Sequence, residues 1–173
     1  MFPTMPTAWI AMGANLGDRA GTLASALKAL KALPGVRRAE ASPLYETAPV
    51  GGPSQPPFLN ACVRLRLAGD DPEALMASLL AIETAHGRLR AERWGPRILD
   101  LDLLLFDARV QDSPTLTLPH PRFHERAFVL KPLADLDPSL RCPLSGAEVS
   151  ALLARVDQAG VLPWKGKDVS WPN

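Results

Sequence analysis

The chain has 173 residues and contains little of several features that would assign a protein to a class directly. Only two residues are cysteines, Cys62 and Cys142, and neither belongs to a close-spaced pattern. This excludes a disulfide scaffold and a cysteine-based zinc or redox motif, and we expect two free thiols in a reducing compartment. No apolar run approaches the length of a membrane span, and the first residues lack the basic and long apolar parts of a signal peptide. We therefore expect a cytoplasmic protein that does not enter the membrane.

An excess of charge of either sign is also missing. The chain has 19 Lys and Arg residues against 18 Asp and Glu residues, which gives a formal net charge of +1. This balance speaks against a surface built for bulk nucleic acid or for an acidic membrane. Hydrophobic residues make up 47% of the chain and charged residues 21%, which are ordinary values for a globular protein. We expect residues 1–173 to form a single monomeric domain with a substantial core.

Hydrophobic periodicity predicts that strands and helices alternate along the chain. Asp18 and Asp71 are typical helix N-caps, and each precedes leucines at helical spacing. The predicted elements are, in order, a strand at 8–12, a helix after Asp18, a strand at 36–45, a strand at 60–67, a helix after Asp71 and a strand at 98–106. This βαββαβ order predicts an α+β, ferredoxin-like fold with helices packed on a mainly antiparallel sheet. Two further short helices are expected at 122–131 and 145–156.

The most informative segment joins a basic, aromatic stretch at 93–97 to the apolar strand that carries Asp100 and Asp102. Residues two apart on a strand point to the same face, so these two carboxylates are expected side by side. Two acidic groups on an apolar strand need a cation to hold them, and hard oxygen ligands beside arginines favour Mg²⁺ carrying a nucleotide phosphate. The leucines at the alternate positions of this strand should face the other way, into the core; they are Leu101, Leu103 and Leu105.

A simpler interpretation of these aspartates stays open at this point. A bare Asp-x-Asp pair also fits a strand end whose carboxylates are solvated or paired with Arg93 or Arg97. The arginine-rich flank favours a site, because guanidinium groups match phosphate oxygens.

Several segments resemble one known family, the 6-hydroxymethyl-7,8-dihydropterin pyrophosphokinases. The strongest resemblance is Arg-Trp-Gly-Pro-Arg-Ile-Leu-Asp-Leu-Asp at 93–102. Other matching segments lie at 10–18, 45–49, 58–61, 118–121 and 126–128. They follow the order of the family's motifs, so the motif-bearing part of the chain covers about residues 8–133. The resemblance implies an enzyme of folate biosynthesis that transfers pyrophosphate from ATP to the hydroxymethyl group of the reduced pterin and releases AMP.

The resemblance also implies the roles of individual residues. It assigns two Mg²⁺ ions to Asp100 and Asp102, and a catalytic role to these residues together with Arg97 and Arg88. The implied ATP contacts are Glu83, Arg88, Arg90, Trp94, Arg97, Leu103, His120 and Arg126. The implied pterin contacts are Thr47, Phe58, Asn60, Trp94 and Phe128. The segments 47–57 and 87–96 are expected to close over the substrates and exclude water.

Some positions depart from the family pattern or have an ordinary structural interpretation. The chain has one residue fewer than the family between Arg90 and Arg93, Pro121 follows His120, and Ala48 stands where many members have proline. Taken alone, Glu83 fits a solvated helix end, His120 a loop histidine, and the two phenylalanines core packing. Asn60 shares a strand face with Phe58, which suits a planar heterocycle. Two rival functions remain: a two-metal nucleotidyl transferase, which would release pyrophosphate, and a nucleic-acid-binding module.

Overall fold

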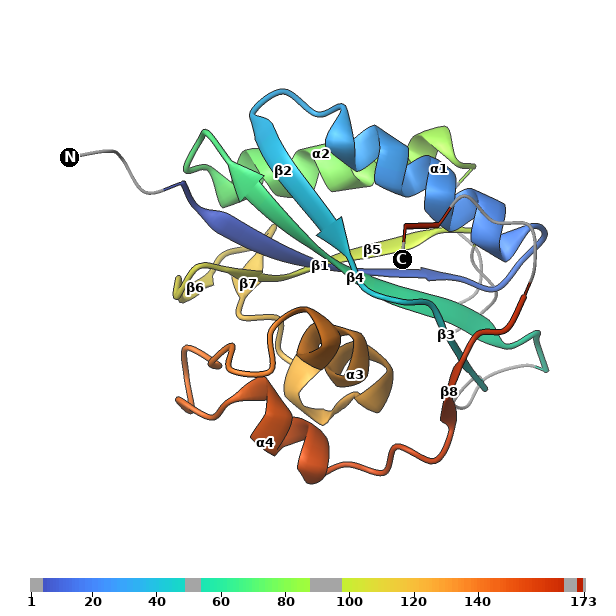
Figure 1. Cartoon of the computed structure of the whole chain (residues 1–173). Coiled ribbons are helices and arrows are strands. Elements are labelled where there is room, and N and C mark those ends of the chain that lie inside the picture. Colours follow the sequence, from blue (N-terminus) through green and yellow to red (C-terminus); the bar gives the residue numbers. More distant parts are fainter. Residues whose placement is uncertain (1–4, 49–53, 88–97, 167–170, 173) are drawn as a thin grey trace.

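The computed structural model describes residues 5–48, 54–87, 98–166 and 171–172. A twisted antiparallel sheet forms its centre, with α1 and α2 on one face and α3 and α4 on the other (Figure 1). The strands of this sheet are β1 (Thr7–Ala14), β2 (Val36–Ala41), β3 (Tyr45–Thr47), β4 (Phe58–Leu67), β5 (Asp100–Phe106) and β8 (Val161–Pro163). In the described part of the chain, no helix is long and apolar enough to cross a membrane.

The strand order confirms the predicted ferredoxin-like fold. The sheet runs β5-β1-β4-β3-β8. β2 pairs with the same edge of β4 as β3 does, at the opposite end of that edge. The four strands of the βαββαβ unit therefore lie in the order fourth, first, third, second, and every pairing is antiparallel. Each helix of this unit connects two strands that are not neighbours in the sheet, which places both helices on the same face.

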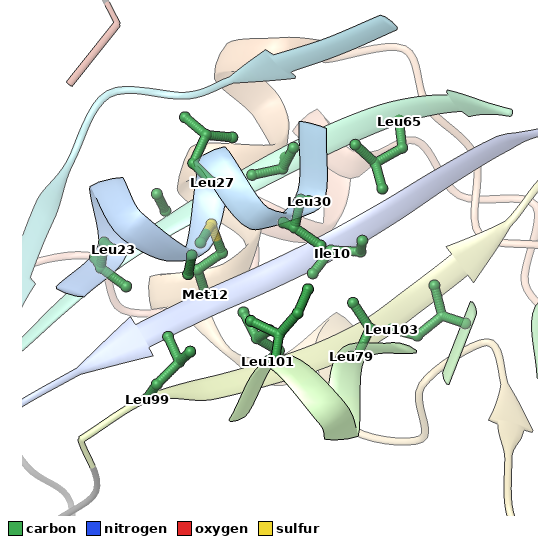
Figure 2. Packing of buried hydrophobic residues seen from close by; sticks show 14 of the residues in the cluster. Ile10, Met12, Leu23, Leu27, Leu30, Leu65, Leu79, Leu99, Leu101 and Leu103 are labelled. Carbon is green, nitrogen blue, oxygen red and sulfur yellow. The ribbon is translucent and has the colours of Figure 1, made fainter. Parts of the chain in front are cut away.

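The helices on this face begin at the predicted caps. Asp18 accepts a hydrogen bond from Gly21 N at 3.1 Å at the start of α1 (Arg19–Lys31), and Asp71 accepts one from Ala74 N at 3.0 Å at the start of α2 (Pro72–Ala85). Their leucine stripes pack on alternating residues of the sheet (Figure 2). The residues that meet in this first core include Ile10, Met12, Leu23, Leu27, Leu30, Leu65, Leu79, Leu99, Leu101 and Leu103.

The opposite face carries a second, smaller core. A short 3₁₀ turn, η1 (Phe123–Glu125), leads into α3 (Ala127–Leu136) and later α4 (Val149–Ala154). Buried residues of these elements pack against Trp9, Cys62 and Leu104 of the sheet. Cys62 and Cys142 are free thiols, as predicted, and both are buried. A hairpin of β6 (Gln111–Asp112) and β7 (Thr117–Leu118) connects β5 to this layer.

Three predicted boundaries are wrong. The strand predicted at 36–45 is two strands. Ala41 pairs with Val63 and Tyr45 with Asn60, so three residues lie opposite two around Pro43, which has no N–H to donate. The helix predicted at 122–131 is α3, which begins at Ala127 and continues past the buried Pro132. The helix predicted at 145–156 is shorter. The sequence patterns missed β8 altogether.

The prediction that Leu105 faces the first core is also wrong. Leu103 pairs with Ile10 of β1, whereas Leu105 pairs with Trp9, so the register shifts by one residue. This bulge turns Leu104 and Leu105 to the second core, and Phe106 returns to the first. Leu101 and Leu103 face the first core, as expected.

Candidate active site

The two aspartates of β5 lie on the sheet face that carries α3. Asp100 pairs with Gly13 and Asp102 with Ala11 of β1, and both carboxylates are half-buried. The leucine between them points into the first core, so the alternation predicted from the sequence holds here. Among the described residues there is no group of three or more His, Cys, Asp or Glu that could hold a metal. A pair of carboxylates fits Mg²⁺, which seldom uses an all-protein cage and takes its other ligands from phosphate oxygens and water.

A row of paired residues across three strands joins this acidic pair to Asn60, one of the predicted pterin contacts. Gly13 pairs with Asp100 on one side and with Asn60 of β4 on the other, and Asn60 pairs in turn with Tyr45 of β3. Asp100 and Asn60 are therefore two strand spacings apart, about 10 Å, on the same face. The glycine keeps the row open, since a Cβ at Gly13 would lie 3.2 Å from Asn60 Oδ1.

The pterin-side residues of β3 and β4 are tied together. Asn60 Nδ2 donates to Thr47 Oγ1 at 2.7 Å, and both side chains are buried, with 6% and 7% exposed. Phe58 pairs directly with Thr47 and is only half-buried, so part of its ring is accessible. The structure thus brings three of the predicted pterin contacts into one patch, which we call the amide wall: Thr47, Phe58 and Asn60.

The helix α3 lies over the same face of the sheet (Figure 1). Phe128 is in its first turn and half-buried, and the guanidinium carbon of Arg126 lies 5.7 Å from the centre of its ring. The hydroxyl of Tyr45 donates to Asp135 at the other end of the helix. Burial and this hydrogen bond raise the pKa of Tyr45, so the phenol stays protonated and keeps donating. This contact joins α3 to the strand that carries Thr47.

His120 is held beside β5 as a neutral ring. Its backbone N–H donates to Leu104 O at 2.8 Å, and Arg122 N donates to its Nδ1 at 3.1 Å. A ring nitrogen that accepts carries no proton, so the neutral ring has its proton on Nε2. Burial is the main cause that lowers the pKa of His120 to about 4, followed by the positive charge of Arg126, while the charge of Asp100 opposes the shift. His120 is therefore a neutral donor near the acidic pair.

Two other predicted ATP contacts have a clear structural position. Glu83 is 1% exposed, and its Oε2 accepts from Leu101 N at 3.2 Å, so the solvated helix end considered from the sequence is wrong. The carboxylate anchors β5 between its two aspartates. Leu103 is 3% exposed in the first core, and its side chain therefore points away from the face of the aspartates; an ATP contact at this position would have to come from its backbone.

The remaining predictions lie outside the described residues. These are the contacts assigned to Arg88, Arg90, Trp94 and Arg97, and the closure of the segment 87–96, of which only Gly87 is described.

A comparison with protein families agrees with this geometry. The family model described as 7,8-dihydro-6-hydroxymethylpterin-pyrophosphokinase (HPPK) matches residues 9–138. The chain belongs to the HPPK family. The matched region contains every described residue that we placed in the site.

Curated relatives within the HPPK family cover nearly the whole chain. The chain is 44% identical over 155 residues to a protein of Pseudomonas aeruginosa, covering 88% of this chain and 93% of the relative. It is 41% identical over 157 residues to a protein of Methylorubrum extorquens, covering 91% and 98%. Both relatives are named 2-amino-4-hydroxy-6-hydroxymethyldihydropteridine pyrophosphokinase.

Solved structures show the same fold. An HPPK-DHPS of Plasmodium falciparum superposes with a TM-score of 0.70 at 14% identity, and an HPPK-DHPS in complex with substrates with 0.68 at 13%. The alignments cover 87% and 88% of this chain but only 43% of each of those chains, so this chain corresponds to less than half of these longer proteins.

Proposed function

We propose that this protein transfers the pyrophosphate group of ATP to the hydroxymethyl group of 6-hydroxymethyl-7,8-dihydropterin and releases AMP, a step of folate biosynthesis. Its membership of the HPPK family supports the reaction. The structural observation that supports it best is the row from Asp100 through Gly13 to Asn60. This row places a candidate metal site and a candidate heterocycle site on one face, about two strand spacings apart.

Asp100 and Asp102 would hold the Mg²⁺ that accompanies ATP, and we propose two ions. Mg²⁺ bound there would neutralise and align the phosphate oxygens, which is most of what phosphoryl-type transfer requires. The strand provides the geometry: successive same-face residues on β5 present both carboxylates in one direction, and Glu83 anchors the backbone between them.

The amide wall and Phe128 would bind the pterin. Asn60 donates to Thr47, which fixes the orientation of its amide before any ligand binds. A preset amide reads the edge of a heterocycle at low entropic cost, and the partly exposed rings of Phe58 and Phe128 offer faces for stacking. The pterin hydroxymethyl group would then point along the row toward the acidic pair.

His120 and Arg126 would bind phosphate from the other side of β5. A neutral His120 donates a hydrogen bond through Nε2 without adding charge, while Arg126 supplies positive charge. We assign the remaining ATP and pterin contacts to Arg88, Arg90, Trp94 and Arg97 on the basis of the family motif.

The wider setting of the reaction also remains a proposal. We propose that residues 1–173 act as one pyrophosphokinase domain, as a monomer, in the cytoplasm and without a nucleic-acid partner.

The test measures the products formed from ATP, Mg²⁺ and the reduced pterin. AMP should appear only when the pterin is present; release of pyrophosphate would instead indicate nucleotidyl transfer. Asp100→Asn and Asp102→Asn should each lower kcat by about 100-fold or more, since each tenfold loss corresponds to about 1.4 kcal/mol of lost transition-state stabilisation. Asp70→Asn is the matched control, because Asp70 pairs with Arg109 on the surface. An aspartate variant that keeps near-normal Mg²⁺-dependent turnover would remove that residue from the metal site.

A further inference from the structure

The first residue of α1 connects the two strands that carry the amide wall. Arg19 Nη1 donates to Glu46 Oε2 at 2.7 Å and to Pro57 O at 2.8 Å. The ion pair is partly exposed, with 24% of the Arg19 side chain and 38% of the Glu46 side chain accessible. One guanidinium nitrogen therefore links a side chain of β3 to the backbone that enters β4.

Both acceptors directly precede residues of the amide wall. Glu46 comes before Thr47, and the carbonyl of Pro57 belongs to the peptide bond that leads into Phe58. A hydrogen bond to that carbonyl restrains the rotation of the peptide plane at the start of β4. Thr47 and Phe58 pair with each other, so restraining both neighbours restrains the whole pair.

Arg19 acts from the side opposite to the amide wall. Glu46 pairs with Leu59, which is fully buried in the first core, whereas Thr47 and Phe58 face α3. Arg19 therefore cannot be a stacking or edge contact of a pterin on the other face. Its effect on binding must pass through the backbone of Thr47 and Phe58.

We infer that Arg19 is a positioning residue for the pterin: it fixes Thr47 and Phe58 at the separation that the heterocycle requires. This inference rests on the proposed function. Binding sites need their contacts held to within about 0.5 Å, and an anchor behind the wall is one way to achieve this. β3 is only three residues long, and the contact with Arg19 adds a side-chain restraint to its backbone pairing with β4 and β8.

The test separates the pterin from ATP in steady-state kinetics. Arg19→Met keeps the length of the side chain and removes both hydrogen bonds. It should raise the KM for the pterin by about tenfold, while the KM for ATP stays within about twofold. Arg19→Lys keeps a charged donor and should recover most of the loss.

Arg141 provides a matched control. Its Nη1 donates to Gly146 O at 2.8 Å and its Nη2 to Glu148 Oε1 at 3.1 Å, so it makes the same two kinds of bond next to α4. Arg141→Met should leave both KM values unchanged. Circular dichroism of each variant verifies that the fold is intact.

The outcomes distinguish the two proposals. If the unaltered protein forms no AMP in response to the pterin, the proposed function is wrong and this inference is wrong with it. If the unaltered protein is active and Arg19→Met leaves the pterin KM unchanged, or raises both KM values equally, only the positioning role is refuted. A rise in pterin KM of the same size in Arg141→Met would also refute it, because a general loss of stability would then explain the effect.

Discussion

Replacing Trp171 with alanine should release the carboxyl-terminal tail from the sheet and lower the free energy of unfolding by about 3 kcal/mol. The indole is 9% exposed, belongs to the first core, and donates from Nε1 to Ser42 O at 2.8 Å. Truncation of a buried Phe or Trp costs about 3–5 kcal/mol when the surroundings cannot relax. A terminal segment can detach instead, so the free energy of docking the tail sets the upper limit of the loss, and we expect the lower end of this range.

The assay is equilibrium unfolding in urea, with thermal unfolding beside it. For a chain of this length, 1 kcal/mol corresponds to about 2–4 °C in Tm, so the variant should melt about 6–12 °C lower. Leu162→Ala is the control within the same tail, because Leu162 is 60% exposed on β8. A surface change of this kind should stay within about 0.5 kcal/mol.

A truncated chain tests the reasoning further. If Trp171 is the residue that docks the tail, a chain that ends at Gly166 should lose as much stability as Trp171→Ala. A separate variant, Trp171→Phe, distinguishes packing from hydrogen bonding, since the phenyl ring fills most of the space and cannot donate to Ser42. This variant should lower the free energy of unfolding by about 1 kcal/mol. A loss below about 1 kcal/mol in Trp171→Ala would refute the assignment of Trp171 to the core.

Two further predictions concern the site. Gly13→Ala places a Cβ 3.2 Å from Asn60 Oδ1 and should disturb the hydrogen bond from Asn60 to Thr47. We expect the KM for the pterin to rise about threefold to tenfold while the KM for ATP stays unchanged. A variant with the same kinetics as the unaltered protein would contradict the close contact. His120 has a pKa of about 4 in the folded protein and about 6.5 in the unfolded chain. Between these two pH values the unfolded state binds more protons than the folded state. The free energy of unfolding measured without Mg²⁺ should therefore rise from about pH 4 to 6.5 and then level off. After screening by solvent the contribution is about 1–2 kcal/mol. Urea unfolding of His120→Gln at pH 4.5 and 7 should lack this part of the rise, and an unchanged pH dependence would refute it.

Local patterns predicted the central fold because they depend on neighbours in sequence. The apolar residues of 60–67 do alternate into the first core, and both predicted aspartate caps accept the expected backbone hydrogen bonds. These features need only strand alternation and helix geometry. The order of the elements then restricted the topology to very few arrangements.

The elements that the sequence did not predict depend on distant parts of the chain. β8 is three residues long and is a strand only because β3 offers it an edge. The position of Trp171 depends on the carbonyl of Ser42, 129 residues earlier. Pro132 would normally end a helix, yet α3 continues through it because Leu130 and Leu133 are buried against the sheet. Tertiary packing overrides local preference at each of these places.

The candidate site was predictable in part for the same reason. Asp100 and Asp102 share a face by simple alternation, whereas their relation to Asn60 depends on the register of three strands. No spacing within the sequence shows that Gly13 lies between them. The role that we infer for Arg19 has no sequence signal at all, since its acceptors lie 27 and 38 residues away.

Burial under α3 explains why β5 presents two carboxylates and no third polar residue on this face. Before the bulge, strict alternation sends leucines to the first core and aspartates to the other face. At the next same-face position the chain has Leu104, and the inserted residue brings Leu105 to that face as well. This is the point at which Phe123 and α3 begin to cover the sheet, and a carboxylate there would be buried without water.

A backbone hydrogen bond at the same irregularity holds His120 against β5. The carbonyl of Leu104 accepts the backbone N–H of His120 at 2.8 Å. A bulge commonly redirects a strand next to an active site, and here it ends the acidic part of β5 at the residue that holds the neutral histidine. Asp100 and Asp102 are therefore placed by β5 itself, whereas His120 lies in the loop between β7 and η1 and is tied to β5 by a backbone hydrogen bond.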